Sequence, residues 1–102
     1  ECEDPAVVCF KENINEIFGE CAGGESGRSI ALSDNAGKAL YLAVGEPGCD
    51  GVRVFDTTFR EQRGQWIKGP LDSSFGDSVA LSGNGSVLAI GAPENHGGNG
   101  TV

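Results

Sequence analysis

A chain of 102 residues has room for one modest domain or for two small repeat units. Its net charge of −8, with only seven scattered Lys and Arg residues, excludes the clustered basic face of a nucleic-acid-binding protein, and no apolar run is long enough for a membrane-spanning helix. The acidity favours a soluble extracellular surface. Seventeen glycines between short apolar runs favour an all-β chain with tight turns. Because there is no initiating Met and no signal-peptide pattern, we expect a processed or excised piece.

Residues 1–25 form a divergent N-terminal segment that two structures fit. Asp4-Pro5 can begin a helix, Gly19 can end it, and apolar residues recur between them at helical spacing, which predicts one amphipathic helix over about 5–18. The β-branched pair Val7-Val8 and the repeat described below favour two strands instead. We favour the strands, and the helix stays open.

The cysteines indicate disulfides in an oxidising compartment. There are four, none in a CxxC pair, and a single histidine is too little to complete a zinc site. An even number in a small, acidic, glycine-rich chain is typical of a disulfide framework. Three pairings are possible, and we favour Cys9 with Cys21 and Cys2 with Cys49, which would staple the N-terminal segment.

The chain contains one phrase twice. Residues 29–33 read SIALS and 42–47 read LAVGEP, while 78–82 read SVALS and 88–93 read LAIGAP. The offset is 49 for the first pair (29 to 78) and 46 for the second (42 to 88), so only the connecting turn differs in length. A period in this range indicates stacked supersecondary units, each unable to bury its apolar face alone.

Alternating apolar and polar residues predict two antiparallel units of four strands each, at about 6–50 and 51–102. Pro47 and Pro93 end a strand in each unit, because proline cannot donate to the ladder. Asn84-Gly85 between apolar runs predicts a hairpin with a primed turn. The predicted strands lie near 6–10, 16–21, 28–33, 39–45, 51–55, 64–69, 77–82 and 87–92.

The second copy resembles the FG-GAP repeat. It reads Phe75-Gly76-Asp77-Ser78-Val79-Ala80-Leu81-Ser82 and then Leu88-Ala89-Ile90-Gly91-Ala92-Pro93. The first copy matches more loosely, since Ser26-Gly27 replaces Phe-Gly and Gly45-Glu46-Pro47 replaces Gly-Ala-Pro. The resemblance covers about 26–102, divided into the rest of the first unit (26–50) and a second unit (51–102). It implies four-stranded propeller blades, as in integrin-alpha-like heads, with a role in adhesion and in protein or glycan contact.

Many members of that family carry a calcium loop between these two phrases. This chain departs from the pattern: Ser82-Gly83-Asn84-Gly85-Ser86 has no carboxylate, and Asp34-Asn35 lack the spaced acidic partners that a hard cation needs. We therefore expect plain turns, no metal and no cofactor.

Two N-glycosylation acceptors lie in predicted turns, Asn84-Gly85-Ser86 and Asn99-Gly100-Thr101. Together with the disulfide-type cysteines they favour a secreted or cell-surface glycoprotein carrying N-linked glycans.

The remaining chemical candidates are weak. His96, after Glu94-Asn95, has no nucleophile with a clear role nearby, so we expect a solvated side chain rather than a catalytic one. Trp66 fits an anchor of the blade core better than a ligand platform. Arg53, Arg60 and Arg63 predict a solvated strand face, with contact to an acidic neighbour as the alternative.

We expect a non-enzymatic secreted or cell-surface structural or adhesion module. It would self-assemble, or contact other extracellular proteins, through its sheet edges, without binding nucleic acid or inserting into a membrane. Gly100-Thr101-Val102 looks like the start of a further copy of the strand at 51–55. Two blades cannot close a propeller, so we expect a piece of a longer propeller, a ring of copies, or a filament in which residues 6–10 of one copy supply the strand expected after Val102 of another. The alternative is a glycan- or cation-binding, lectin-like propeller fragment.

Overall fold

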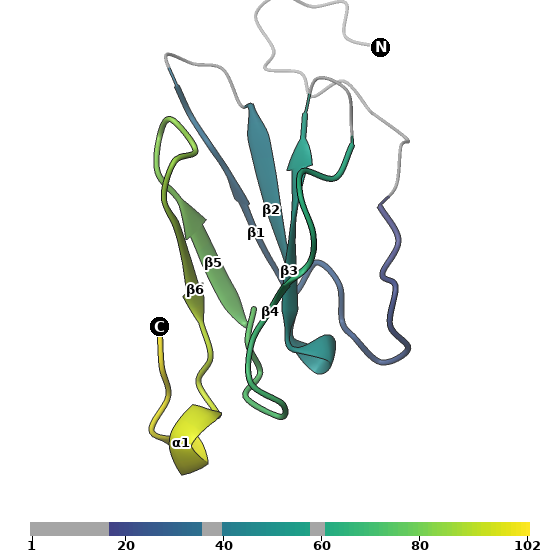
Figure 1. Ribbon diagram of the computed structural model, residues 1–102, viewed down its shortest axis with the longest axis vertical. Coiled ribbons are helices and arrows are strands. Elements are labelled where there is room, and N and C mark those ends of the chain that lie inside the picture. The colour runs from purple at the N-terminus through teal and green to yellow at the C-terminus, as the bar shows by residue number, and fades with distance from the viewer. Residues whose placement is uncertain (1–16, 36–39, 58–60) are drawn as a thin grey trace, which may run out of the picture.

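Two antiparallel β-sheets dominate the computed structural model, which describes residues 17–35, 40–57 and 61–102 (Figure 1). The larger sheet holds four strands in chain order, β1 (Ser29–Leu32), β2 (Tyr41–Glu46), β3 (Gly51–Asp56) and β4 (Ile67–Lys68). The smaller sheet holds β5 (Ser78–Leu81) and β6 (Leu88–Gly91). The two short helical segments are η1 (Pro47–Cys49), between β2 and β3, and α1 (Asn95–Gly98), after β6. The prediction of a β-rich chain is confirmed.

Large and small side chains alternate along the strands, and the pairing gathers each kind on one face. We call the face built from Ser, Ala and Gly the small face, and the face built from Ile, Leu and Val the large face. In β1–β2 the small face comprises Ser29, Ala31, Ala43 and Gly45, and the large face Ile30, Leu32, Leu42 and Val44. In β5–β6 the small face comprises Ser78, Ala80, Ala89 and Gly91, and the large face Val79, Leu81, Leu88 and Ile90.

The β5–β6 hairpin lies against the small face of β1–β2 (Figure 1). The hydroxyl of Ser29 donates a hydrogen bond of 2.8 Å to the carbonyl of Gly76, which lies two residues before the start of β5. Gly45 leaves room for the same carbonyl, since a Cβ at this position would collide with its oxygen. The large face of β5–β6 is thereby half-buried on the small face of β1–β2.

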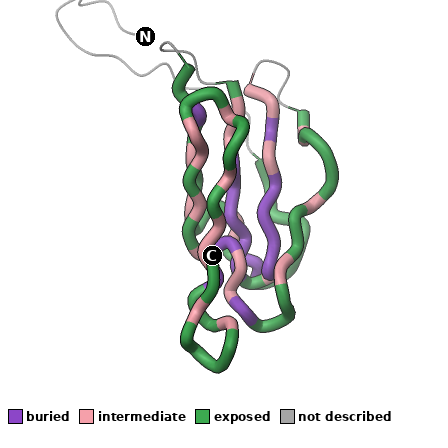
Figure 2. Tube along the Cα trace, turned by 60° about the vertical axis from the view of Figure 1, so that its left-hand side comes forward, coloured by how far each residue is buried: buried purple, intermediate pink, exposed green. Residues whose placement is uncertain are grey.

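The buried core lies mainly along β2 and β3, the purple stretches of Figure 2. Ala43 and Val52 have no exposed surface, and Val44 and Phe55 are nearly as deep. Full burial of an aliphatic or aromatic side chain contributes about 1.5–3 kcal/mol, so these residues of the larger sheet supply much of the stabilisation.

The two copies of the repeated phrase have the same local hydrogen bonds. The N–H of Gly27 donates to the carbonyl of Gly45, and the N–H of Gly76 to that of Gly91, both at 3.0 Å. Ser33 and Ser82 likewise begin equivalent turns. The N–H of Tyr41 donates to the Ser33 hydroxyl, and the N–H of Val87 donates to the Ser82 hydroxyl, both at 3.0 Å. The repeat seen in the sequence is therefore a structural repeat.

The strands group differently from the prediction of four strands in 6–50 and four in 51–102. The four-stranded sheet takes β1 and β2 from the first of these units and β3 and β4 from the second. Only the short turn 47–50 separates β2 from β3, so these two strands form a hairpin across the expected boundary.

The strand predicted at 16–21 is wrong for its described part, residues 17–21, which are irregular. Their polar groups bond to side chains of the sheet rather than to a neighbouring strand, as shown below. The strand predicted at 6–10 and most of the alternative helix over 5–18 lie outside the described residues. The strand predicted at 64–69 shortens to β4.

The predicted hairpin between β5 and β6 is confirmed, but its turn is not of the primed type. A type I′ turn needs positive φ at both central residues and a type II′ turn needs it at the first, whereas of Asn84 and Gly85 only the second has it, at 76°. The N–H of Ser82 bonds to the carbonyl of Val87, which encloses a four-residue loop, 83–86, rather than a two-residue one. The carbonyl oxygen of the Asn84 side chain accepts the N–H of Ser86 and stabilises this wider turn.

Candidate protein-interaction surface

Strand β1 forms an open edge of the larger sheet, since among the described residues it pairs only with β2. The N–H of Ser33 bonds to Tyr41, and antiparallel pairs alternate, so Ile30 and Leu32 direct their backbone groups away from β2. Their side chains are also 62% and 56% exposed. An open edge beside exposed apolar side chains is a surface that favours pairing with another protein.

Strand β6 forms a second open edge. Within the described part of the chain, its residues Leu88–Gly91 pair only with β5. Just beyond it, Ala92 and Thr101 exchange two backbone hydrogen bonds, of 2.8 and 3.0 Å, as β2 and β3 do in the larger sheet. The expectation that Gly100-Thr101-Val102 begins a further copy of the β3 strand agrees with this bridge.

A disulfide fixes the described segment before β1, which begins at residue 17, to the larger sheet. It joins Cys21 to Cys49, at the end of η1, with their Cα atoms 6.2 Å apart. The favoured pairing of Cys9 with Cys21 and Cys2 with Cys49 is therefore wrong. The N–H of Gly48 bonds to the carbonyl of Gly24 and brings the two chain segments together, which places Cys21 beside Cys49. Cys2 and Cys9 lie outside the described residues.

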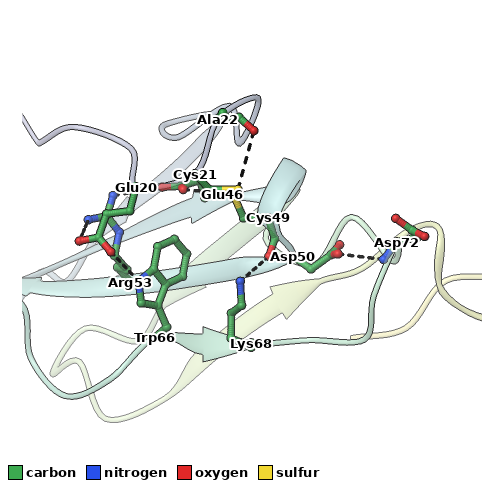
Figure 3. Close-up of a disulfide and its surroundings, with 10 residues drawn as sticks. All are labelled: Glu20, Cys21, Ala22, Glu46, Cys49, Asp50, Arg53, Trp66, Lys68 and Asp72. Carbon is green, nitrogen blue, oxygen red and sulfur yellow. Dashed lines mark hydrogen bonds and ion pairs between the residues drawn. A yellow bond between two sulfur atoms is a disulfide. The ribbon is translucent and has the colours of Figure 1, made fainter.

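A buried ion pair lies next to the disulfide (Figure 3). Nη2 of Arg53 is 3.1 Å from Oε1 of Glu46, and the side chains are 4% and 0% exposed. Arg53 also donates to the carbonyl of Phe18 at 2.9 Å and lies 3.5 Å from the carboxylate of Glu20. The expectation of a solvated face is wrong for Arg53; the alternative, contact with acidic neighbours, is right. Arg63 is exposed, and Arg60 lies outside the described residues.

Trp66 covers this cluster rather than the core between the sheets. Its ring lies between two cations, with Cζ of Arg53 5.0 Å and Nζ of Lys68 4.8 Å from the ring centroid. The indole N–H donates to Glu20 at 2.9 Å (Figure 3). Gly51 gives the ring its place, because a Cβ there would collide with it. Trp66 is half-buried and is held by the chain's own charges.

Asp50 organises the loop that leads into β5. Its carboxylate accepts the backbone N–H groups of Asp72, Ser73 and Ser74, over 2.8, 3.1 and 2.9 Å. The residue is 7% exposed and left-handed, with φ of 52°, a conformation that Asp tolerates better than most side chains. Asp50 thus ties the turn between β2 and β3 to the loop that leads into β5.

The two glycosylation acceptors are both exposed. Asn84 lies in the turn between β5 and β6. Asn99 follows α1 and lies at an open pocket of about 480 Å³ on the small face of β5–β6, lined mainly by Asp77, Ser78, Gly91, Ala92, Gly100 and Thr101. Both positions are open to a glycan.

Within the described ranges, no group of three or more His, Cys, Asp and Glu side chains could hold a metal ion. His96 is exposed, and the neighbouring Glu94 carboxylate accepts from the hydroxyl of Ser74 at 3.2 Å. The short turn at 82–86 is closed by its own hydrogen bonds. The helices of the described segments are all too short to cross a membrane.

Comparison with family models, with curated proteins and with solved structures finds no match to this chain.

Glu46 and Asp50 are the structural residues that the sequence reasoning missed. The repeat could have pointed to Glu46, because the second copy has Ala92 at the equivalent position. A charged residue that occurs in one copy and not in the other indicates a role specific to that copy. Asp50 aligns with Asn99 at the offset of 49 (50 to 99), so a polar side chain recurs at that turn.

Proposed function

We propose that this chain is a non-enzymatic extracellular structural or adhesion module built from FG-GAP-like, propeller-blade-like units. It self-associates, or contacts protein partners, through its β-sheet edges. The observation that carries the proposal is the open edge of β1, where Ile30 and Leu32 expose both their backbone groups and most of their side chains.

Three features support an extracellular location. The Cys21–Cys49 disulfide is of the kind that persists in oxidising compartments. Two exposed acceptors, Asn84 and Asn99, suit a chain that carries N-linked glycans. The surface is strongly acidic, with a net charge of −8.

The likeness to FG-GAP repeats rests on the repeated phrases and is supported by the matching turns at Gly27 and Gly76. Both glycines have positive φ, 90° and 97°, so the turn that precedes the first strand of each copy has one shape. A module whose units share this geometry suits a repetitive assembly, such as a propeller, a ring or a filament.

Sedimentation velocity over a concentration series tests self-association. The proposal predicts species larger than the monomer as concentration rises, and hydrogen exchange of the assembled chain should show new protection at the outward amides of Ile30 and Leu32. As an internal control, the amide of Ser33, already bonded to Tyr41, should keep the same protection. A chain that stays monomeric in concentrated solution contradicts self-association.

Intact mass of the chain secreted from a eukaryotic host tests the compartment. We expect added mass that an N-glycosidase removes and disulfides that a reductant opens. Four free thiols with no added sugar would contradict an extracellular protein.

A further inference from the structure

Equivalent residues of β1 and β5, the first strands of the two repeat copies, have opposite exposure. In β1 the large residues Ile30 and Leu32 are exposed, while the small ones between them are half-buried. In β5 the small residues Ser78 and Ala80 are exposed, while the large ones are half-buried. The sequence pattern is the same in both strands, so the difference comes from which face of each strand is covered.

The internal junction explains this reversal. The small face of β1–β2 is covered by the large face of β5–β6. That single contact uses one small face and one large face. It leaves open the small face of β5–β6 and, on the large face of β1–β2, only the β1 residues Ile30 and Leu32, since on β2 Leu42 is half-buried and Val44 is buried. The molecule therefore presents the large face at β1 on one side and the small face of β5–β6 on the other.

Three contacts define the internal junction. The hydroxyl of Ser29 donates to the carbonyl of Gly76, and Gly45 leaves the space which that carbonyl occupies. At the margin, Nε of Arg28 lies 3.3 Å from Oδ1 of Asp77. Ser29 and Gly45 belong to the small face of β1–β2. Gly76 belongs to the turn that leads into β5.

The same pair of a serine and a glycine recurs, without a partner segment of the described chain on it, on the small face of β5–β6. Ser78 and Gly91 are the equivalents of Ser29 and Gly45, and both line the pocket of about 480 Å³. A Cβ built at Gly91 would meet only Ser78, whereas one at Gly45 also meets the incoming Gly76. The equivalent incoming turn exists as well: Gly27 is exposed, with nothing within 4 Å of a Cβ built on it.

We propose that a second copy of this chain docks head-to-tail, with the large face of its β1 on the small face of β5–β6. The Gly27 turn of the second copy enters the pocket, its carbonyl accepts from the Ser78 hydroxyl, and its Arg28 faces Asp77 of the first copy. The junction between copies thus repeats the junction within each copy. It is a heterologous contact, which extends into rings or filaments.

The inference rests on the proposed self-association and names a different surface for it, the sheet faces rather than the edges. The segment 17–24 leaves the docking strand free, because its contacts lie at Glu46, Arg53 and η1 while Ile30 and Leu32 remain exposed.

Two charge substitutions at exposed positions test it. Ala80→Arg blocks the small face and Ile30→Asp blocks the large face, and circular dichroism should show both variants folded. Each variant alone should sediment as a monomer. An equimolar mixture should form a heterodimer, because one intact small face still meets one intact large face. A mixture in which no heterodimer forms, although the wild type associates, overturns the proposal.

A glycine pair provides a matched second test. Gly91→Ala should fold with wild-type thermal stability, because the one close neighbour of its Cβ is the Ser78 hydroxyl, which can rotate away, but it should lose self-association. Gly45→Ala, at the equivalent occupied position, should lower the thermal stability of the monomer instead. Gly91→Ala associating as strongly as wild type overturns the face contact.

The outcomes also separate this inference from the proposed function. If wild type, Ala80→Arg and Ile30→Asp all associate, and new amide protection appears at the edges, the edges carry the assembly and the face contact is wrong. If wild type never associates, self-association itself is wrong.

Discussion

At the scale of single residues, three buried charged side chains hold the described segments together. Glu46 and Arg53 pair beside Phe18 and Glu20, and Asp50 gathers the loop before β5. Burying a charge is costly unless hydrogen bonds or an opposite charge replace its water. Each of these groups has such partners, so removing a partner should cost far more than an exposed ion pair would.

Replacing Asp50 tests the loop anchor. Asp50→Ala leaves three backbone N–H groups without their carboxylate. We expect the free energy of unfolding to fall by more than about 1.5–3 kcal/mol, the usual worth of a single hydrogen bond to a charged group. Urea denaturation measures it. Asp50→Asn keeps an acceptor oxygen and should lose less; equal losses in the two variants would contradict the anchoring role.

Replacing Glu46 tests the buried ion pair. Glu46→Ala copies the residue that the second repeat carries, Ala92, but it leaves Arg53 buried without its main counter-charge. We expect a loss of about 3–5 kcal/mol. The double variant Glu46→Ala with Arg53→Met should recover much of it, since no unpaired charge then remains. An additive double variant would show that the two charges do not interact.

At the scale of elements, the disulfide braces the segment before β1 against η1. The two cysteines are 28 positions apart. Closing a loop of that length removes conformational entropy from the unfolded chain, which raises the free energy of unfolding by about 3–4 kcal/mol. Replacing Cys21 and Cys49 by Ser should therefore lower the denaturation midpoint without changing the strand content. Unchanged stability would contradict the Cys21–Cys49 pairing.

The strands were predictable because their alternation is local, and the Pro after β2 and β6 marks their ends. The grouping of strands into sheets was not, since it depends on whether the short turn at 47–50 closes a hairpin. The ion pair was hidden for the same reason. Glu46 and Arg53 lie on different strands, and only the register set by that turn brings them to one face. The pairing of Cys21 with Cys49 could not be predicted from the spacing of the cysteines, because it depends on the hydrogen bond between Gly24 and Gly48 that brings the two segments together.

At the scale of the whole molecule, the chain is a pair of related sheets stacked face to face, which leaves open the small face of β5–β6 and the β1 part of the large face of β1–β2. A repeat unit that cannot bury both of its faces alone needs neighbours. The internal junction shows how two such units fit, and the outer faces repeat its parts at Gly27, Ser78 and Gly91. Assembly through these faces needs no change in the fold.

Isotope-filtered nuclear Overhauser spectroscopy on a mixture of labelled and unlabelled copies tests this arrangement most directly. The account predicts contacts between copies that join the methyl group of Ala80 to the methyl groups of Ile30 and Leu32. Contacts confined to the backbone of β1 or β6, or a complete lack of signals between copies in concentrated solution, would contradict it.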